Sequence, residues 1–198
     1  MLDETDREEE TFICLFLQKD REGKTMDLNG KKVLVAFFSH IGENYFGGKI
    51  MEISKGNTHI AAEMIAENCG ADLFEIKPEV EYSHIYKECV EEAKRDRIGD
   101  ARPALKEDKD IAEYDVIFLG YPNWCGTMPM PVWTFLDGHD FTDKIVCPFC
   151  TNEGSKMGLS EGDLAKLIPT AQLKAGLPIH GSTVKDAGEE IKAWMVDL

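Results

Sequence analysis

The sequence predicts a three-layer α/β/α sandwich built on a five-stranded parallel sheet of order 2-1-3-4-5, with an N-terminal extension. Two observations lead to this fold class. From Lys32 onward, short apolar runs alternate with segments of helical periodicity, as in successive βαβ units. A polar loop containing glycine follows the first apolar run, which is typical of doubly wound sheets with this strand order.

The predicted strands are short apolar runs. Val33–Phe38 is apolar throughout, as expected for a strand that is buried on both faces of a parallel sheet. The later strands are Asp72–Lys77, Val116–Gly120, Lys144–Cys150 and a weaker one within Ala175–Val184.

The predicted helices lie between these strands. Asn57–Cys69 has a core stripe of Ile60, Met64 and Ile65, and Gly70 ends it. The next helix, His84–Arg97, carries Tyr86, Val90 and Ala93 on one face. Three further helices are expected at Pro131–Leu136, with proline in its first turn, at Glu161–Ile168, and at Asp186–Leu198, where Trp194 has the spacing of a core residue.

Residues 1–30 differ in composition from residues 31–198, which we interpret as the folded domain. They combine an acidic run, an apolar patch at Phe12–Leu17 and a polar stretch up to Gly30. We interpret them as an extension that either adds an edge strand or is partly disordered. Met26 is an alternative natural start, because the polar stretch after it leads directly into the first strand.

The charge balance restricts the partners of the protein. Its 198 residues include 22 basic and 37 acidic side chains, a net charge of −15, which disfavours nucleic acid as a partner. Such a charge suits association with a basic protein surface, although an acidic surface alone would explain it equally well. No run approaches the roughly 18 apolar residues needed to span a membrane, and the acidic N-terminus is unlike a signal peptide. We therefore expect a cytoplasmic protein whose six cysteines are reduced thiols.

Several familiar motifs are absent, incomplete or in the wrong structural context. No two glycines stand two apart, which excludes the G-x-G-x-x-G dinucleotide fingerprint, and Gly48 occupies the lysine position of a P-loop. Gly158–Gly162 matches G-x-S-x-G, but it lies well past the preceding strand, and Ser160 with Asp163 favours a capping box instead of a nucleophile. Cys147 and Cys150 have C-x-x-C spacing, yet on a strand they face opposite sides. No second ligand pair completes a metal site.

Three polar loops each follow a predicted strand, at the sheet edge where doubly wound folds bind ligands. The first offers neutral donors at a helix N-terminus, which favours a phosphate group. The second contains an aromatic ring that can stack on a flat heterocycle, and the third is rich in polar groups that can bond its edge. The candidate residues are Ser39, His40, Gly56, Asn57 and Thr58 in the first loop, Pro122, Asn123, Trp124, Cys125 and Gly126 in the second, and Thr151, Asn152, Glu153, Gly154 and Ser155 in the third.

With these loops in this order, the chain from Lys32 onward resembles the flavodoxin-like family. The resemblance implies that FMN is the cofactor, with its phosphate on the first loop and its isoalloxazine ring between the second and third. Two departures stand out. Ile41–Lys55 interrupts the phosphate loop, and Cys125 stands where relatives often carry a second bulky aromatic residue.

Two functions share this scaffold. The first is an electron shuttle that docks on redox partner proteins with basic surfaces, and the acidity of the chain favours it. The alternative is an NAD(P)H-dependent quinone or small-molecule reductase, for which the insertion and the open side at Cys125 would build a substrate pocket. A third reading, a flavin-free interaction module, is disfavoured by the presence of all three polar loops.

Overall fold

The computed structural model of the protein describes residue 28 and residues 30–198. The extension predicted for residues 1–30 lies almost entirely outside the described residues, so its interpretation stays a prediction, as does the division of the chain at residue 31. No helix in the described part is long and apolar enough to cross a membrane.

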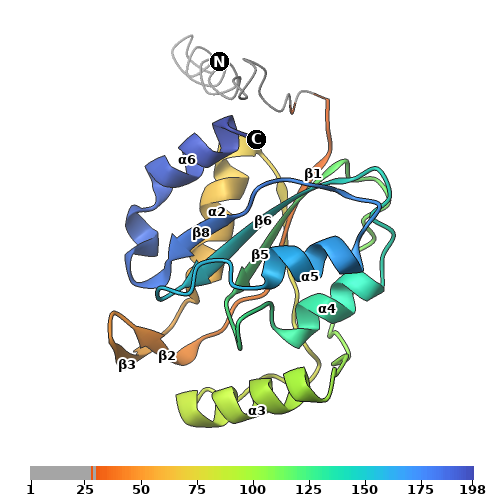
Figure 1. The fold of residues 1–198 in the computed structure, drawn as a ribbon. Coiled ribbons are helices and arrows are strands. Elements are labelled where there is room, and N and C mark those ends of the chain that lie inside the picture. Colours follow the sequence, from red (N-terminus) through yellow and green to blue (C-terminus); the bar gives the residue numbers. More distant parts are fainter. Residues whose placement is uncertain (1–27, 29) are drawn as a thin grey trace.

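The central sheet has the predicted architecture (Figure 1). Its strands are all parallel, in the spatial order β4-β1-β5-β6, and both β7 and β8 pair with β6 beyond it. In chain order this is the predicted 2-1-3-4-5 arrangement, with a fifth strand that is split in two. The strands are β1 (Val33–Phe37), β4 (Asp72–Glu75), β5 (Val116–Pro122), β6 (Ile145–Asn152), β7 (Gln172–Leu173) and β8 (Leu177–His180).

Helices cover both faces of the sheet and complete the three layers. One core combines Val35 and Phe118 of the sheet with α2 and α6, and the other combines Leu34 and Ile117 with α4 and α5. Trp194 of α6 packs edge-on against Phe118 with ring centroids 5.7 Å apart, which confirms its predicted core role. The helices are α2 (Asn57–Cys69), α3 (Tyr86–Ile98), α4 (Met130–Asp137), α5 (Ser160–Leu167), the 3₁₀ helix η1 (Gly181–Asp186) and α6 (Gly188–Val196).

Helix α3 is placed differently from the others. Figure 1 shows it lying below the carboxyl ends of the strands instead of against a face of the sheet. Only Cys89 and Ala93 of this helix are buried. Tyr86, Val90 and Ala93 share the predicted apolar face of α3. This face is directed toward the cavity at the sheet edge, which these three residues line.

The insertion in the first loop folds as a separate hairpin. Strands β2 (Gly42–Phe46) and β3 (Lys49–Ile53) pair antiparallel, and Gly47 and Gly48 connect them with φ of 58° and 90°. A two-residue turn with positive φ at both positions is the type that matches strand twist, and glycine adopts it without strain. The insertion is thus a compact element, and its two ends, Gly42 and Ile53, lie side by side.

The capping box predicted for α5 is wrong. Leu159 is the N-cap, and Ser160 is the first helical residue and is fully buried. The Ser160 hydroxyl donates to the Met157 carbonyl at 2.6 Å and accepts from the Tyr121 hydroxyl at 2.9 Å. Asp163 accepts from Thr127 at 2.7 Å. Ser160 and Asp163 thus make long-range contacts with Tyr121 and Thr127, on either side of the second loop, which local spacing does not reveal.

Cys147 and Cys150 project to opposite faces of β6, as predicted. Cys147 belongs to the core beneath α2 and α6, whereas Cys150 belongs to the core beneath α4 and α5. Burial raises the pKa of the Cys147 thiol to about 12, so it is a neutral packing group. The five cysteines of the described chain are free thiols, and Cys14 lies outside it.

Candidate functional site

The three predicted loops meet around one cavity of about 390 Å³ at the carboxyl ends of β1, β5 and β6. A volume of this size is typical of small-molecule and cofactor sites. The predicted residues Gly56, Gly126 and Gly154 belong to the same loops but do not line the cavity. The predicted residues that do line it are Ser39, His40, Asn57, Thr58, Pro122, Asn123, Trp124, Cys125, Thr151, Asn152, Glu153 and Ser155.

The first loop forms a candidate anion cradle at the N-terminus of α2. Gly56 approaches the loop so closely that a Cβ there would lie 2.1 Å from Ser39 Oγ, so only glycine fits. The Ser39 hydroxyl accepts the His59 amide at 3.1 Å. The amides of Asn57 and Thr58 have no acceptor among the described residues, and the helix dipole favours an anion beside them.

Two threonine side chains join the first loop to the third. Thr58 Oγ1 lies 2.7 Å from Thr151 Oγ1, and both residues are buried. This hydrogen bond holds the N-terminus of α2 against the end of β6. It therefore fixes the spacing between the anion cradle and the loop that would face the edge of a bound ring.

A tight turn shapes the second loop. Trp124 and Thr127 exchange backbone hydrogen bonds of 2.9 and 3.0 Å, and Cys125 and Gly126 between them have φ of 51° and 84°. Asn123 ties this loop to the third one by donating its amide to the Thr151 carbonyl at 2.8 Å and its side chain to the Lys156 carbonyl at 2.9 Å. The turn projects Cys125 into solvent at the mouth of the cavity.

The Trp124 ring is positioned by three other rings. Its centroid lies 5.2 Å from that of Phe38, 5.3 Å from that of His40 and 5.2 Å from that of Tyr82, all in edge-on geometry. Such contacts are favourable beyond the area they bury. The indole is thus held in one orientation at the cavity wall before any ligand binds.

The third loop is shaped by Asn152. Its side-chain oxygen accepts the amides of Gly154 at 2.8 Å and Lys156 at 2.9 Å, and its nitrogen donates to the Ile179 carbonyl at 3.1 Å. The Asn152 side chain, which the sequence predicts to bind a cofactor, therefore makes hydrogen bonds within the protein that shape the third loop. A direct contact between Asn152 and a cofactor stays a prediction.

Part of the cavity wall is formed by residues that the sequence did not predict. Helix α3 contributes Tyr86, Cys89, Val90, Ala93 and Lys94, and hairpin strand β2 contributes Glu43, Asn44 and Tyr45. One signal for α3 was present in the sequence, since its apolar positions are few for a helix packed on a sheet. The role of the hairpin carries no comparable signal.

Helix α3 is attached at both ends. At its N-terminus the Glu43 carboxylate accepts the Tyr86 amide at 2.9 Å, and the Glu43 amide donates to the His84 carbonyl at 2.8 Å. Because the carboxylate lies at the positive end of the helix dipole, this contact stabilises the first turn. The hairpin and α3 therefore form one connected wall.

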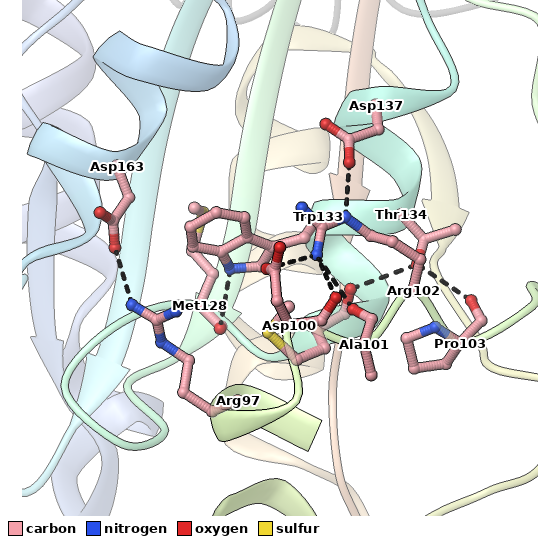
Figure 2. Close-up of polar contacts among 11 residues, drawn as sticks. Arg97, Asp100, Ala101, Arg102, Pro103, Met128, Trp133, Thr134, Asp137 and Asp163 are labelled. Atoms are coloured by element: carbon pink, nitrogen blue, oxygen red, sulfur yellow. Dashed lines mark hydrogen bonds and ion pairs between the residues drawn. The ribbon is translucent and has the colours of Figure 1, made fainter. Parts of the chain in front are cut away.

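At the other end of α3, two arginines hold the ring of Trp133 in α4 (Figure 2). The Arg97 and Arg102 guanidinium carbons lie 5.1 and 5.3 Å from the ring centroid, a cation–π distance. Arg97 also lies 3.9 Å from Asp163 of α5, and Arg102 bonds Asp137 of α4. The middle of α3, between these two attachments, faces the cavity.

Two buried polar atoms of the cavity-lining residues have no hydrogen-bond partner among the described residues, namely His40 Nε2 and Glu153 Oε1. Burial, with a contribution from nearby His84, lowers the pKa of His40 to about 4. The imidazole is therefore neutral at pH 7, and it adds no positive charge to the anion cradle. Unpaired buried atoms of this kind are expected where a ligand supplies the missing partner.

Together, the parallel sheet of this order and the cavity at the carboxyl ends of its strands define a doubly wound α/β protein with a candidate ligand site at the sheet edge. The family model described as flavodoxin matches residues 32–198. The chain therefore belongs to the flavodoxin family.

Solved structures of similar proteins agree with this assignment. A candidate flavoprotein from Bacteroides eggerthii is 31% identical, with a TM-score of 0.66 and coverage of 84% of this chain and 96% of that one. A candidate flavoprotein from Bacteroides uniformis is 29% identical, with a TM-score of 0.64 and coverage of 84% and 98%. A Lactobacillus acidophilus flavoprotein in complex with FMN is 22% identical, with a TM-score of 0.59 and coverage of 79% and 98%. No curated protein matches the sequence.

Proposed function

We propose that this protein binds FMN non-covalently and transfers electrons through it. The observation that carries the proposal is the convergence of the anion cradle at α2, the held indole of Trp124 and the polar third loop on one cavity. A cofactor with a phosphate at one end and a flat ring at the other matches this spatial arrangement of protein groups. Membership of the flavodoxin family and the FMN complex of the Lactobacillus acidophilus protein support the choice of FMN.

Each loop has a defined task in this proposal. The amides of Asn57 and Thr58 and the hydroxyl of Ser39 would hold the phosphate without a basic side chain. Trp124 would stack on the ring, and backbone groups of residues 122–126 and 151–155 would bond its edge. FMN supplies the reversible redox chemistry, while the protein binds and orients it.

We infer that the protein acts as an electron carrier between redox partner proteins. Its net charge of −15 supports this role, because a strongly negative surface steers association with a basic partner. The attachment of α3 and the hairpin across the cavity favours a second candidate, an NAD(P)H-dependent reductase of quinones or similar small molecules. Tyr45, Tyr86 and Val90 would form the apolar wall of its substrate pocket.

The absorption spectrum of the purified protein, before and after incubation with excess FMN and desalting, tests the cofactor. Retained visible flavin bands are expected, and a protein that stays colourless after loading would refute the proposal. Oxidation of NADH or NADPH in the presence of a quinone then separates the two roles. A reductase turns over alone, whereas a carrier needs an added flavin reductase.

A further inference from the structure

Glu153 in the third loop has a carboxylate with one engaged and one free oxygen. Its side chain is only 15% exposed and lines the cavity. Oε2 accepts the Gly47 amide of the hairpin turn at 3.1 Å and lies 3.9 Å from His180 Nδ1. Oε1 is fully enclosed and has no hydrogen-bond partner among the described residues.

A free carboxylate oxygen in such a place requires a donor. Ionised carboxylates only accept hydrogen bonds, and an enclosed acceptor left unpaired is costly. Gly181 and Asn57 show where Oε1 lies. A Cβ at Gly181 would lie 2.8 Å from Oε1 and 2.6 Å from Asn57 Nδ2, so Oε1 lies close to the first residue of α2. The missing donor would therefore lie near the turn that we assign to the phosphate.

The chemistry of FMN selects the donor. Its phosphate is an anion that offers acceptors and would be repelled by Glu153. Its ring would lie farther along, where Trp124 and the second loop are. The ribityl chain joins the two and carries hydroxyl groups, which are donors of the required kind.

We propose that Glu153 Oε1 accepts a hydrogen bond from a ribityl hydroxyl of FMN, while Oε2 keeps the hairpin turn at the cavity through Gly47. This inference rests on the proposed function. It makes Glu153 a determinant of ribityl recognition, and it couples the position of the hairpin to the occupancy of the site, because both contacts use one carboxylate.

Titration with three flavins tests the inference. Lumiflavin lacks the ribityl hydroxyls and the phosphate, riboflavin lacks the phosphate, and FMN has both. Quenching of flavin fluorescence gives each dissociation constant for the parent, for Glu153→Ala and for Glu153→Gln. The surface variant Glu189→Ala serves as the control, since it removes the same charge from a side chain that is 90% exposed.

We expect Glu153→Ala to weaken riboflavin binding about tenfold and to leave lumiflavin binding unchanged, since one charge-assisted hydrogen bond is lost. An equal loss for riboflavin and lumiflavin would overturn the inference, because it would indicate a general distortion. Unchanged riboflavin binding with tighter FMN binding would also overturn it, because Oε1 would then face the phosphate. Glu153→Gln keeps the shape of the side chain and gives a folded variant for the same comparison.

Hydrogen exchange at the Gly47 amide provides a separate readout. In the parent protein we expect this amide to be protected from exchange, and its protection to increase when FMN binds. Glu153→Ala should remove both the protection and the increase. An amide that exchanges equally in parent and variant would refute the link to the hairpin. A parent that binds none of the three flavins would refute the proposed function itself, whereas flavin binding that Glu153 does not affect would refute this inference alone.

Discussion

At the scale of single residues, the hydroxyl pair of Thr58 and Thr151 joins two of the three loops inside the protein. We expect Thr58→Val and Thr151→Val each to lower the free energy of unfolding by about 1–3 kcal/mol, because each leaves one buried hydroxyl unpaired. The double variant should cost clearly less than the sum, since neither hydroxyl then remains. Urea unfolding measures all four proteins, and strictly additive losses would contradict the coupling.

The same variants test the phosphate assignment. Thr58→Val is expected to weaken FMN binding, because residue 58 lies in the first turn of α2 beside the cradle. Thr151→Val should weaken binding as well, since it removes the same hydrogen bond from the other side and so loosens the first turn of α2. If neither variant changes the dissociation constant of FMN, the placement of the phosphate at this turn is wrong.

Trp124→Ala tests the stacking role of the indole. We expect flavin bound to this variant to be less quenched than flavin bound to the parent, because the indole no longer lies against the ring. Fluorescence of the bound cofactor measures the effect. Trp194→Phe is the control, as Trp194 packs on Phe118 away from the cavity. Equal quenching in the parent and in Trp124→Ala would remove Trp124 from the stack.

His40 should make stability depend on pH. Burial lowers its pKa from 6.5 to about 4 in the folded protein. Between these values the unfolded chain binds more protons, so the free energy of unfolding falls as the pH drops from 6.5 toward 4. One group contributes at most about 1.4 kcal/mol per pH unit. Urea unfolding of the FMN-free protein should show a shallower decline for His40→Gln, and identical declines would contradict a neutral buried imidazole.

Residue types and their order along the chain were enough to predict the three loops. Glycine, asparagine and threonine at the start of a helix are recognisable because their chemistry is local. The partners of their side chains were not predictable, because Thr58 bonds Thr151 across 93 positions and Glu153 bonds Gly47 across 106. The loop-shaping role of Asn152 depends on such contacts as well, through the Ile179 carbonyl of β8.

At the scale of elements, the hairpin supports α3 through Glu43. Replacing Glu43 with alanine removes the acceptor of the Tyr86 amide, so the first turn of α3 should open more readily. We expect faster hydrogen exchange in that turn and faster release of FMN, with a loss of about 1 kcal/mol in local stability. Exchange measured by mass spectrometry over residues 84–98 checks this.

Glu52→Ala is the control for this prediction. Glu52 lies opposite Glu43 in the hairpin, is exposed, and repels it as a like charge. Its removal should leave α3 protection unchanged or slightly higher. If both variants increase exchange in α3 equally, the effect belongs to the hairpin in general and not to the bond from Glu43.

The strands of the central sheet and the helices between them were predictable from periodicity, and the sheet order was predicted from the polar loop after the first strand. The hairpin of β2 and β3 was not predicted. The orientation of α3 was not predictable. An apolar face indicates that one side of a helix is covered, but it does not indicate which part of the protein covers it. The split of the fifth strand into β7 and β8 was not predicted either. Between them the Ala175 carbonyl accepts the Trp194 indole N–H at 2.9 Å, a tertiary contact that the local sequence does not reveal.

At the scale of the whole molecule, the net charge of −15 bears on how the protein meets its partner. If the protein is a carrier, its encounter with a basic partner is accelerated by long-range attraction, which salt screens over a Debye length of about 10 Å at 0.1 M. We therefore expect the bimolecular rate constant for electron transfer with a basic redox protein to fall steeply between low and moderate ionic strength. Stopped-flow mixing with the FMN-loaded protein measures it.

A neutral quinone provides the contrast that decides between the two roles. It feels no long-range attraction, so its reduction should change little with ionic strength. A carrier should then react slowly with the quinone and fast with the basic protein at low salt. Fast, salt-independent quinone reduction, sustained by NAD(P)H without a second protein, would instead favour the reductase, and the cavity wall formed by α3 and the hairpin would be its substrate pocket.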